Sequence, residues 1–457
     1  MAGPISSFLL ALLALAATPF TLLRILLFSR TSSHLKSSKC ALVTGGRSQK
    51  ALYITRALAR SGYSVILAEE TGWSTFCAAR FSNSIHKIYS LPLGGGQAYI
   101  DALLQIAKSN RITLFLPCSG VATAIEEAAA ARLMKKQIPS LVAIIQDADL
   151  LETLHEKDRF IDLVHSLGMD APAGHLIKSP QEGLQLLRRT GNTRFLFKAA
   201  TVPDDVGRSD MTTYPFLHAD ASVDWRGTEK RLETGMNIPI CKQTPYLAQE
   251  FIGGMGATEW CTHATVIDGR ITAFVCCPSN DMLMTYYNAT HTAMGQRTRK
   301  WSEEFLDRLA EHPRWSKSDL TGHFSFDFIH QPESDRLVVI ECNPRVHTAI
   351  CLLRKDKKLG QAMDGTYTQS SPITPSLNVE PVSWLGHDLI ARRWPLHHAT
   401  DILSKAGVED GAWEETDAWS YFGFYHVQWV GLLLVEAINL RRWSRINIST
   451  ARVFLAK

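Results

Sequence analysis

The segments FSFDFI at residues 324–329 and ECNPR at residues 341–345 decide the fold of this chain. Both alternate apolar with polar side chains, which predicts two neighbouring antiparallel β-strands. On such strands Asp327 and Glu341 can face each other, and Asn343 projects from the same face as Glu341 because side chains repeat every two residues. Two carboxylates and an amide oxygen form an oxygen-only ligand set, which suits Mg²⁺ bridging phosphates. The same acids can also belong to an ordinary sheet end, so the neighbouring segments have to be considered.

Upstream segments add groups that suit phosphate. Residues 194–198 (RFLFK) place Lys198 at the end of an apolar strand, where burying an ammonium is unfavourable unless an anion meets it. Residues 199–214 form a polar connection of small residues that can fold over a nucleotide. Residues 249–256 (QEFIGGMG) then end a strand with a glycine-rich turn, and Glu259 follows. Each segment alone is a weak signal.

In this order the segments resemble the ATP-grasp superfamily, in which ATP lies between two α+β subdomains and drives formation of an acyl phosphate that an amine attacks. The resemblance implies ATP and Mg²⁺ as cofactors, or Mn²⁺ in place of Mg²⁺. It implies catalytic roles for Lys198 and for Arg345, which would face the transferred phosphate or acyl oxygen. It also assigns binding residues: Lys157 and Lys198 for phosphate, Glu250 and Ile252 for adenine, Glu259 near the ribose, and Asp327, Glu341 and Asn343 for the metal.

A narrower resemblance is carried by RFSNS at residues 80–84, EWCTH at 259–263 and ECNPRVH at 341–347. These segments are similar to the mycosporine-glycine synthetase-like ligases, which join glycine to 4-deoxygadusol. The implied function is an ATP-dependent carbon–nitrogen ligase of secondary metabolism, which joins an amino acid to a small acceptor activated by phosphorylation. A carboxylate–amine ligase acting on a different natural-product acid is the alternative. Residues 199–242 and 278–299, which would line the acceptor pocket, match less well.

Two hypotheses of another class remain. The loop TGGR at residues 44–47 lies between an expected strand and an expected helix, where helix-terminus amides can hold an anion, so an NAD(P)-dependent oxidoreductase is conceivable. The sequence has neither the GxGxxG nor the GxxxxGK spacing that would support it. A membrane-tethered nucleotide-binding protein without catalysis is the other hypothesis, and the presence of Asp327, Glu341 and Asn343 argues against it.

The expected fold class is α/β plus α+β: an ATP-grasp fold preceded by a parallel-sheet domain and an N-terminal membrane-anchor segment. The chain alternates short apolar strands with helices and then changes to longer strands with alternating faces, which are typical of antiparallel pairs. Asp268-Gly269 predicts a hairpin turn between two of the longer strands. The expected domains are residues 1–39 (anchor and spacer), 40–150 (pre-ATP-grasp), 151–354 (ATP-grasp) and 355–457 (linker and amphipathic Trp/Arg-rich region). In residues 40–150 the predicted strands are Cys40–Thr44, Tyr63–Ala68, Ile112–Pro117 and Leu141–Gln146, and the predicted helices are Lys50–Ser61, Gln97–Asn110 and Val121–Lys135.

The N-terminal segment 5–29 contains a single charge, Arg24, in 25 positions, which is close to the length needed to span a bilayer. Basic residues follow it, and a positive flank is normally retained on the cytosolic side. We expect an uncleaved anchor, with the protein membrane-associated and its catalytic domain facing the cytosol. A cleaved signal peptide and a helix lying in the membrane interface are the alternatives. The basic residues after the segment are Arg30, His34, Lys36 and Lys39.

The C-terminal segment 427–446 combines tryptophans with Arg441, Arg442 and Arg445, which suits either a lipid headgroup boundary or a helix packed on the protein body. The overall charge is small, since 48 Lys+Arg against 44 Asp+Glu leave +4, so no nucleic-acid partner is expected. Nine cysteines, an odd number without a CxxC spacing, argue against a disulfide framework and favour a reduced compartment. The expected partners are a small-molecule acceptor, an amino acid and a membrane, and the oligomeric state is not predicted.

Overall fold

The computed structural model describes residues 3–30, 39–191, 193–199, 211–254, 256–279, 285–384 and 409–455. The chain forms two compact units. Unit 1 consists of Met1–Glu152, Trp260–Phe326 and Asn343–Lys457, and unit 2 consists of Thr153–Glu259 and Asp327–Cys342.

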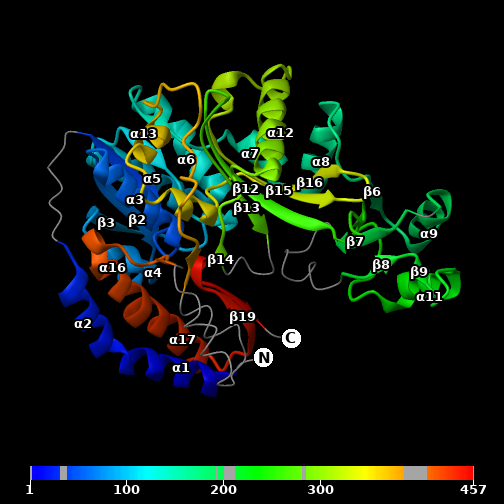
Figure 1. Ribbon diagram of the computed structural model, residues 1–457, viewed down its shortest axis with the longest axis horizontal. Coiled ribbons are helices and arrows are strands. Elements are labelled where there is room, and N and C mark those ends of the chain that lie inside the picture. Colours follow the sequence, from blue (N-terminus) through cyan, green and yellow to red (C-terminus); the bar gives the residue numbers. More distant parts are fainter. Residues whose placement is uncertain are drawn as a thin grey trace. The chain divides into compact units, whose positions relative to one another are not determined.

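Unit 1 contains a five-stranded parallel sheet with the strand order β3-β2-β1-β4-β5 (Figure 1). Val43 of β1 packs with Leu52 of α3, whereas Leu42 packs with Leu103 of α5, so helices cover both faces. The predicted parallel sheet is therefore confirmed, although β3 was not predicted. The elements are β1 (Cys40–Thr44), α3 (Gln49–Arg60), β2 (Ser64–Glu70), α4 (Trp73–Phe76), β3 (Ile85–Leu91), α5 (Gly96–Ser109), β4 (Leu114–Leu116), α6 (Ala124–Gln137), β5 (Val142–Ala143) and α7 (Ala148–His155).

A second sheet has the order β13-β12-β15-β16. Its strands are β12 (Thr258–Ile267), β13 (Arg270–Ser279), β15 (Gly322–Gln331) and β16 (Arg336–Asn343). The turn between β12 and β13 has φ of 48° at Asp268 and 77° at Gly269, and two positive values are what a two-residue type I′ hairpin requires, as predicted. Helix α12 (Ala293–Ala310) packs on this sheet within unit 1, where the rings of Phe305 and Phe326 lie 5.3 Å apart.

Unit 2 is built on an antiparallel sheet with the order β6-β11-β7-β8. Helix α9 begins with Pro180 after the N-cap Ser179, whose hydroxyl accepts a hydrogen bond from the Glu182 amide. Leu184 and Leu187 of this helix pack on Phe195 and Phe197 of the sheet. The elements are α8 (Lys157–Ser166), β6 (Gly174–Ile177), α9 (Pro180–Arg189), β7 (Phe195–Ala199), β8 (Thr213–Tyr214), β9 (Phe216–Leu217), β10 (Val223–Asp224), α11 (Trp225–Lys230) and β11 (Tyr246–Glu250).

The two ends of the chain meet in unit 1, where α1 contacts α17 and α2 contacts α16 (Figure 1). Pro4–Phe28 is long and apolar enough to cross a membrane, a test that core helices and signal sequences also pass. The helix is interrupted at Ala17, where Pro19 lacks the N–H that would continue the ladder. The elements are α1 (Pro4–Ala16), α2 (Thr18–Phe28), α16 (Ala418–Phe422), a π-helical turn (Gly423–Gln428), α17 (Trp429–Ile438), β19 (Trp443–Asn447) and β20 (Arg452–Leu455).

Part of the expected polar linker is structured. Residues 359–364 form α13 (Leu359–Asp364), in which Leu359, Ala362 and Met363 are fully buried. A small sheet joins β17 (Val382–Ser383), further along the same stretch, to β14 (Thr285–Tyr286) and β18 (Glu409–Asp410). Helix α13 and strand β17 are therefore part of the core of unit 1.

Candidate active site

Lys198 lies on one face of the unit 2 sheet, as the register shows. It is paired with Leu247 of β11, so Lys198, Leu247 and, two residues later, Gln249 project to the same side. The Lys198 Nζ donates a hydrogen bond to the Gln249 Oε1 at 2.8 Å. Phe195 and Phe197 project to the opposite side, which α9 covers. The lysine is thus held by a neutral amide on the face that α9 leaves uncovered.

The expected adenine-binding segment is fixed by a network around Glu250. Its carboxylate accepts hydrogen bonds from the Ala173 amide at 3.0 Å and from the Arg336 Nη1 at 3.1 Å. Arg336 also binds both carboxylate oxygens of Asp170 at 2.7 Å, and these bonds raise the pKa of the guanidinium. Ile252, two residues after Glu250, is 4% exposed. The Glu250 side chain therefore holds β11, β16 and the segment before β6 together.

An ion pair joins Lys157 to Glu341, although 184 positions separate them in the sequence. The Lys157 Nζ lies 3.0 Å from the Glu341 Oε2, and the two side chains are 23% and 16% exposed. Lys157 is the first residue of α8, and Glu341 lies near the end of β16. Asp327 lies in the neighbouring strand β15, and it too is partly exposed. The fold of unit 2 thus brings together one expected phosphate ligand and an expected metal ligand.

The segment after Glu341 continues into unit 1 with alternating exposure. Asn343, Arg345 and His347 are partly exposed, whereas the residues between them are buried. The Arg345 Nη2 donates to the Asn343 Oδ1 at 2.8 Å, and the Arg345 carbonyl accepts from the Ser325 hydroxyl at 3.0 Å. Asn343 and Arg345 are therefore oriented by each other and by β15.

A buried polar group formed by Thr44, Lys50, Tyr99 and Glu127 lies at the carboxyl end of β1 in unit 1. The Glu127 carboxylate accepts hydrogen bonds from the hydroxyls of Thr44 and Tyr99, and burial raises its pKa to about 7. The Lys50 Nζ donates to the Val346 carbonyl at 3.0 Å. Burial, followed by the charge of Arg345, lowers the pKa of Lys50 to about 7.

The loop at residues 44–47 makes close contacts with other residues of unit 1. A side chain at Gly45, whose φ is +75°, would come within 2.6 Å of the Cys118 backbone. Arg47 forms ion pairs with Glu69 and Glu70 at the end of β2, where dinucleotide-binding folds place the carboxylate that binds ribose. These contacts give the oxidoreductase hypothesis no support.

The structure describes the expected ribose-binding residue Glu259, but only the ends of the expected closing loop at residues 199–214. Glu259 is exposed in β12, one residue after the start of the strand. Most of the expected closing loop at 199–214, residues 200–210, lies outside the described residues. No group of three or more His, Cys, Asp or Glu side chains suited to a metal occurs in the described part of the chain. The Asp327–Glu341–Asn343 set contains only two such side chains, and its third ligand is an amide.

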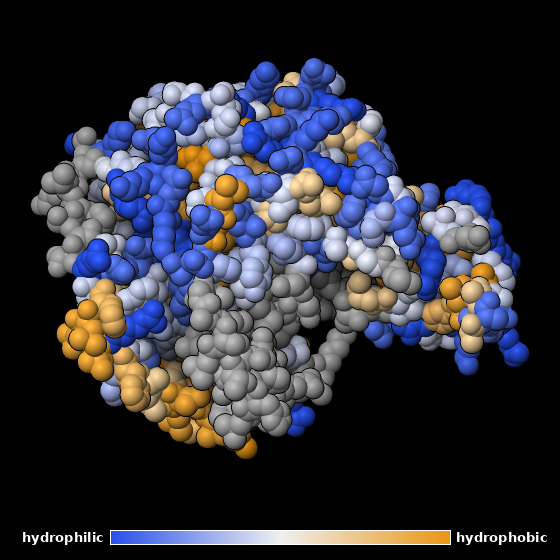
Figure 2. Space-filling model, in the orientation of Figure 1, coloured by the Kyte–Doolittle hydropathy of each residue, from blue (hydrophilic) through white to orange (hydrophobic). Residues whose placement is uncertain are grey.

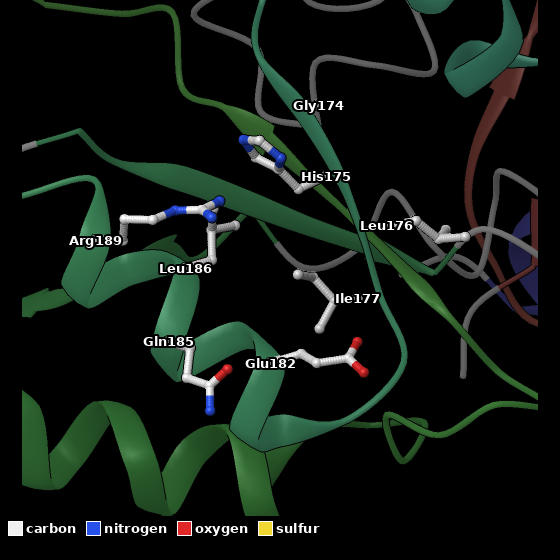
Figure 3. A pocket seen from close by; sticks show the side chains of 8 residues that line it. All are labelled: Gly174, His175, Leu176, Ile177, Glu182, Gln185, Leu186 and Arg189. Carbon is white, nitrogen blue, oxygen red and sulfur yellow. The ribbon is translucent and has the colours of Figure 1, made fainter.

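A groove of about 560 Å³ lies on the α9 side of the unit 2 sheet. Figure 3 shows the side chains that line it. His175 and Ile177 line it from β6, and Glu182 and Arg189 line it from α9. Burial, followed by the charge of Arg189, lowers the pKa of His175. The register places His175 opposite Ala248, on the face away from Lys198. The groove is therefore separate from the expected phosphate-binding face.

Sequence reasoning missed Arg336, Asp170 and the site-facing role of Gln249. Arg336 begins β16, and its position beside Glu250 depends on contacts between segments 86 residues apart. Gln249 carried a usable signal, because it lies one residue before the expected hinge Glu250 on an apolar strand. Lys50 was predicted as part of a helix, but its burial was not predicted.

No protein-family model and no curated protein matches the sequence. Solved structures do match: N5-carboxyaminoimidazole synthetase from Staphylococcus aureus has 13% sequence identity and a TM-score of 0.52, covering 77% of this chain and 83% of that chain. An ADP complex of an N5-carboxyaminoimidazole ribonucleotide synthetase has 10% identity and a TM-score of 0.50, covering 77% and 82%. These proteins are ATP-grasp ligases, so the chain has the ATP-grasp fold.

Proposed function

We propose that the protein is an ATP-dependent ligase that forms a carbon–nitrogen bond and releases ADP and phosphate. The observation that carries the proposal is the ion pair between Lys157 and Glu341 in a chain with the ATP-grasp fold. It pairs a cation suited to phosphate with an acid suited to a divalent metal. Lys198 adds a second cation on a sheet face that α9 leaves uncovered.

The donor set fits a hard divalent cation. Asp327 and Glu341 lie on hydrogen-bonded neighbouring strands, and Asn343 follows Glu341 on the same side of β16. We propose that these three residues hold Mg²⁺, or Mn²⁺ in its place, which would neutralise charge on the phosphate oxygens of ATP. Lys157 and Lys198 would bind the same phosphates. The backbone at Glu250 and Ile252 would bind adenine, and Glu259 would bind the ribose.

In the proposed reaction an acceptor oxygen attacks the γ-phosphorus of ATP, and ADP leaves. The amine nitrogen then bonds to the phosphorylated carbon, phosphate departs with the carbon–oxygen bond electrons, and the nitrogen loses a proton. Arg345 would steady the negative oxygen during both steps. This chemistry needs alignment and charge neutralisation, with no covalent bond to the enzyme.

For the substrates we propose an amino acid and a small acceptor of secondary metabolism, as in mycosporine-glycine synthetase-like ligases. The support is the similarity of residues 80–84, 259–263 and 341–347 to those enzymes. A carboxylate–amine ligase with a different natural-product acid is the second candidate. Its support is the same fold, whose solved examples include the synthetases described above.

The test is ADP release by the full-length protein in detergent with Mg²⁺ATP, a panel of amino acids, and either 4-deoxygadusol or a panel of carboxylic acids. We expect ADP only when both an amine and an acceptor are present, with a C–N-linked product in the mass spectrum. Lys198→Ala should lower turnover at least about 100-fold, whereas the exposed control Lys178→Ala should not. Binding of NAD(P)H without binding of ATP would overturn the proposal in favour of the oxidoreductase.

We further propose that residues 5–29 attach the protein to a membrane, with the ligase facing the cytosol. The support is the apolar Pro4–Phe28 helix and the basic residues that follow it. Two glycosylation sequons, at Asn288 and Asn447, allow a direct test of topology. We expect the membrane-bound protein to carry no glycan at either site, and a glycan would contradict the proposed orientation.

A further inference from the structure

The outer side of α1 and α2 exposes a continuous set of large apolar side chains, which we call the helix-pair surface. Figure 2 shows orange and tan atoms gathered along these two helices at the lower left. None of its members is charged. Arg24, the one charged residue in Pro4–Phe28, is only partly exposed and does not belong to it. The helix-pair surface consists of Ile5, Phe8, Leu9, Leu12, Leu13, Leu15, Phe20, Leu23, Leu26, Leu27 and Phe28.

The inner side of the same helices is held to the C-terminal region by polar contacts. The Trp443 Nε1 donates to the Ser7 hydroxyl oxygen at 2.8 Å. The His426 Nε2 lies 2.8 Å from the Thr21 hydroxyl. The Arg24 guanidinium lies 4.1 Å from the centre of the Trp413 ring. Both α1 and α2 are therefore fixed along their length by specific partners.

These partners belong to the folded body of unit 1. The buried Asp417, just before α16, pairs with Arg56 of α3 at 2.7 Å. Gln428, just before α17, accepts a hydrogen bond from the Ala78 amide at 2.6 Å and donates to the Arg47 carbonyl at 2.8 Å. A bilayer-spanning arrangement of Pro4–Phe28 would have to break the contacts of Ser7, Thr21 and Arg24 or carry this body into the lipid.

We infer that α1 and α2 lie in the plane of a phospholipid bilayer, with the helix-pair surface at the boundary between headgroups and acyl chains and without crossing the membrane. This inference deepens the proposed membrane attachment and is independent of the ligase activity. A bilayer surface fits better than a protein partner, because specific protein interfaces carry about one hydrogen bond per 100–200 Å² and this surface offers hydrocarbon almost throughout. Burial of the apolar outer side in the interface would drive binding, while the inner side stays on the protein.

Charge at the end of α17 favours anionic lipid. Ile438 and Leu440 are 78% and 76% exposed, and the exposed Arg441 and Arg442 follow directly. Apolar side chains next to guanidinium groups match the order of acyl chain and phosphate in a leaflet. The same segment contributes Trp443, which holds Ser7 of α1.

Binding is tested by sedimentation of the full-length protein with vesicles of phosphatidylcholine alone or with about one-third phosphatidylserine. We expect stronger binding to the anionic vesicles, and a loss of about tenfold or more in the double variant Phe20→Glu/Leu26→Glu. Leu377→Glu is the matched control, because Leu377 is 77% exposed, like Phe20 at 76% and Leu26 at 80%, and lies outside the helix-pair surface. Unchanged binding of the double variant would overturn the inference.

The orientation is tested by single cysteines at Gly3 and Ser29, which flank α1 and α2 and lie outside the helix-pair surface. They are labelled with an impermeant maleimide after the protein binds sealed vesicles. The wild-type protein corrects for its own cysteines, seven of which are buried. We expect labelling from outside at both positions, and protection of one end would show a span and refute the inference. A vesicle-free dimer that the double variant converts to monomer would instead assign the surface to a second copy and also refute it. ADP release by the double variant in detergent should equal that of the wild type, which separates this test from that of the ligase.

Discussion

The Nζ of Lys157 and the Oε2 of Glu341 are 3.0 Å apart, and the same carboxylate is a proposed metal ligand. In the absence of ligand the lysine satisfies the charge of the acid. Were the proposed divalent cation to bind Glu341, the ammonium of Lys157 would become available to a phosphate oxygen. The ion pair therefore keeps the proposed phosphate-binding lysine next to the proposed metal site.

Glu341→Gln should abolish most of the ligase activity while leaving the fold intact. The variant removes a negative charge that the proposed metal needs, so we expect turnover to fall about 100- to 1000-fold. The lost ion pair is partly exposed and should cost at most about 1 kcal/mol in the free energy of unfolding. ADP release and urea unfolding measure the two effects, with Glu303→Gln on α12 as the control. Full activity in the Glu341 variant would remove it from the metal site.

Arg336→Met should weaken ATP binding more than it lowers turnover. Arg336 joins Glu250 to Asp170, so its loss leaves the proposed adenine-binding strand less well fixed. We expect KM for ATP to rise about tenfold with a smaller change in kcat, because the residue acts on positioning. Arg308→Met, which breaks a surface pair with Glu304, is the control. An unchanged KM would show that this network does not position the nucleotide.

Glu127→Gln should change how stability depends on pH. Burial raises the pKa of Glu127 from 4.5 to about 7, so between these values the folded protein keeps a proton that the unfolded chain has lost. This contribution to the free energy of unfolding is fully present below pH 4.5 and is lost as pH rises through about 7. The slope is at most about 1.4 kcal/mol per pH unit, and the variant should lack it.

Urea unfolding across this pH range measures the effect of Glu127. Glu304→Gln, on the surface of α12, serves as the control and should keep the wild-type slope. Lys50 has its own pKa lowered to about 7, so its contribution increases with pH between about 7 and 10.5 and leaves the lower range to the carboxyl groups. Equal slopes for the Glu127 variant and the wild type would contradict the prediction.

Asp417→Asn should destabilise unit 1 strongly. Asp417 and Arg56 are 4% and 3% exposed, and the variant leaves the guanidinium buried without its counter-charge. Removing one partner of such a pair costs about 3–5 kcal/mol. The Ser82 hydroxyl and the Asn83 amide also donate to Asp417, so its loss affects the contact between α3, α16 and the segment before β3. A decrease below about 1 kcal/mol in urea unfolding would show that the pair is dispensable.

The regular elements of the fold could be predicted because their signals are local. The Asp268-Gly269 turn and the alternating strands around it follow from residues close in sequence, and the structure confirms them. Strand β3 was missed because the sequence IHKIYSL has an irregular burial pattern with no clean alternation. Helix α13 was missed because it is only six residues long and lies in a polar stretch.

The candidate site could be predicted as a set of residue types, and less well as a set of contacts. Lys157 was named from the family resemblance and Glu341 from the strand pattern, but their pairing depends on how α8 packs near β16. Arg336 has no local feature that distinguishes it from a surface arginine at a strand start. The contact of Ser7 with Trp443 spans 436 positions, and no sequence pattern connects them.

The distance in sequence between Ser7 and Trp443 affects when α1 can fold during synthesis of the chain. Translation at about 5–20 residues per second places roughly 20 to 90 seconds between the emergence of Ser7 and that of Trp443 from the ribosome. During this interval the side of the nascent α1 that packs on α17 in the folded protein lacks that cover. Docking of α1 on α17 therefore has to wait until nearly the whole chain has been made, and until then both apolar sides of α1 are open to contact with lipid or with other chains.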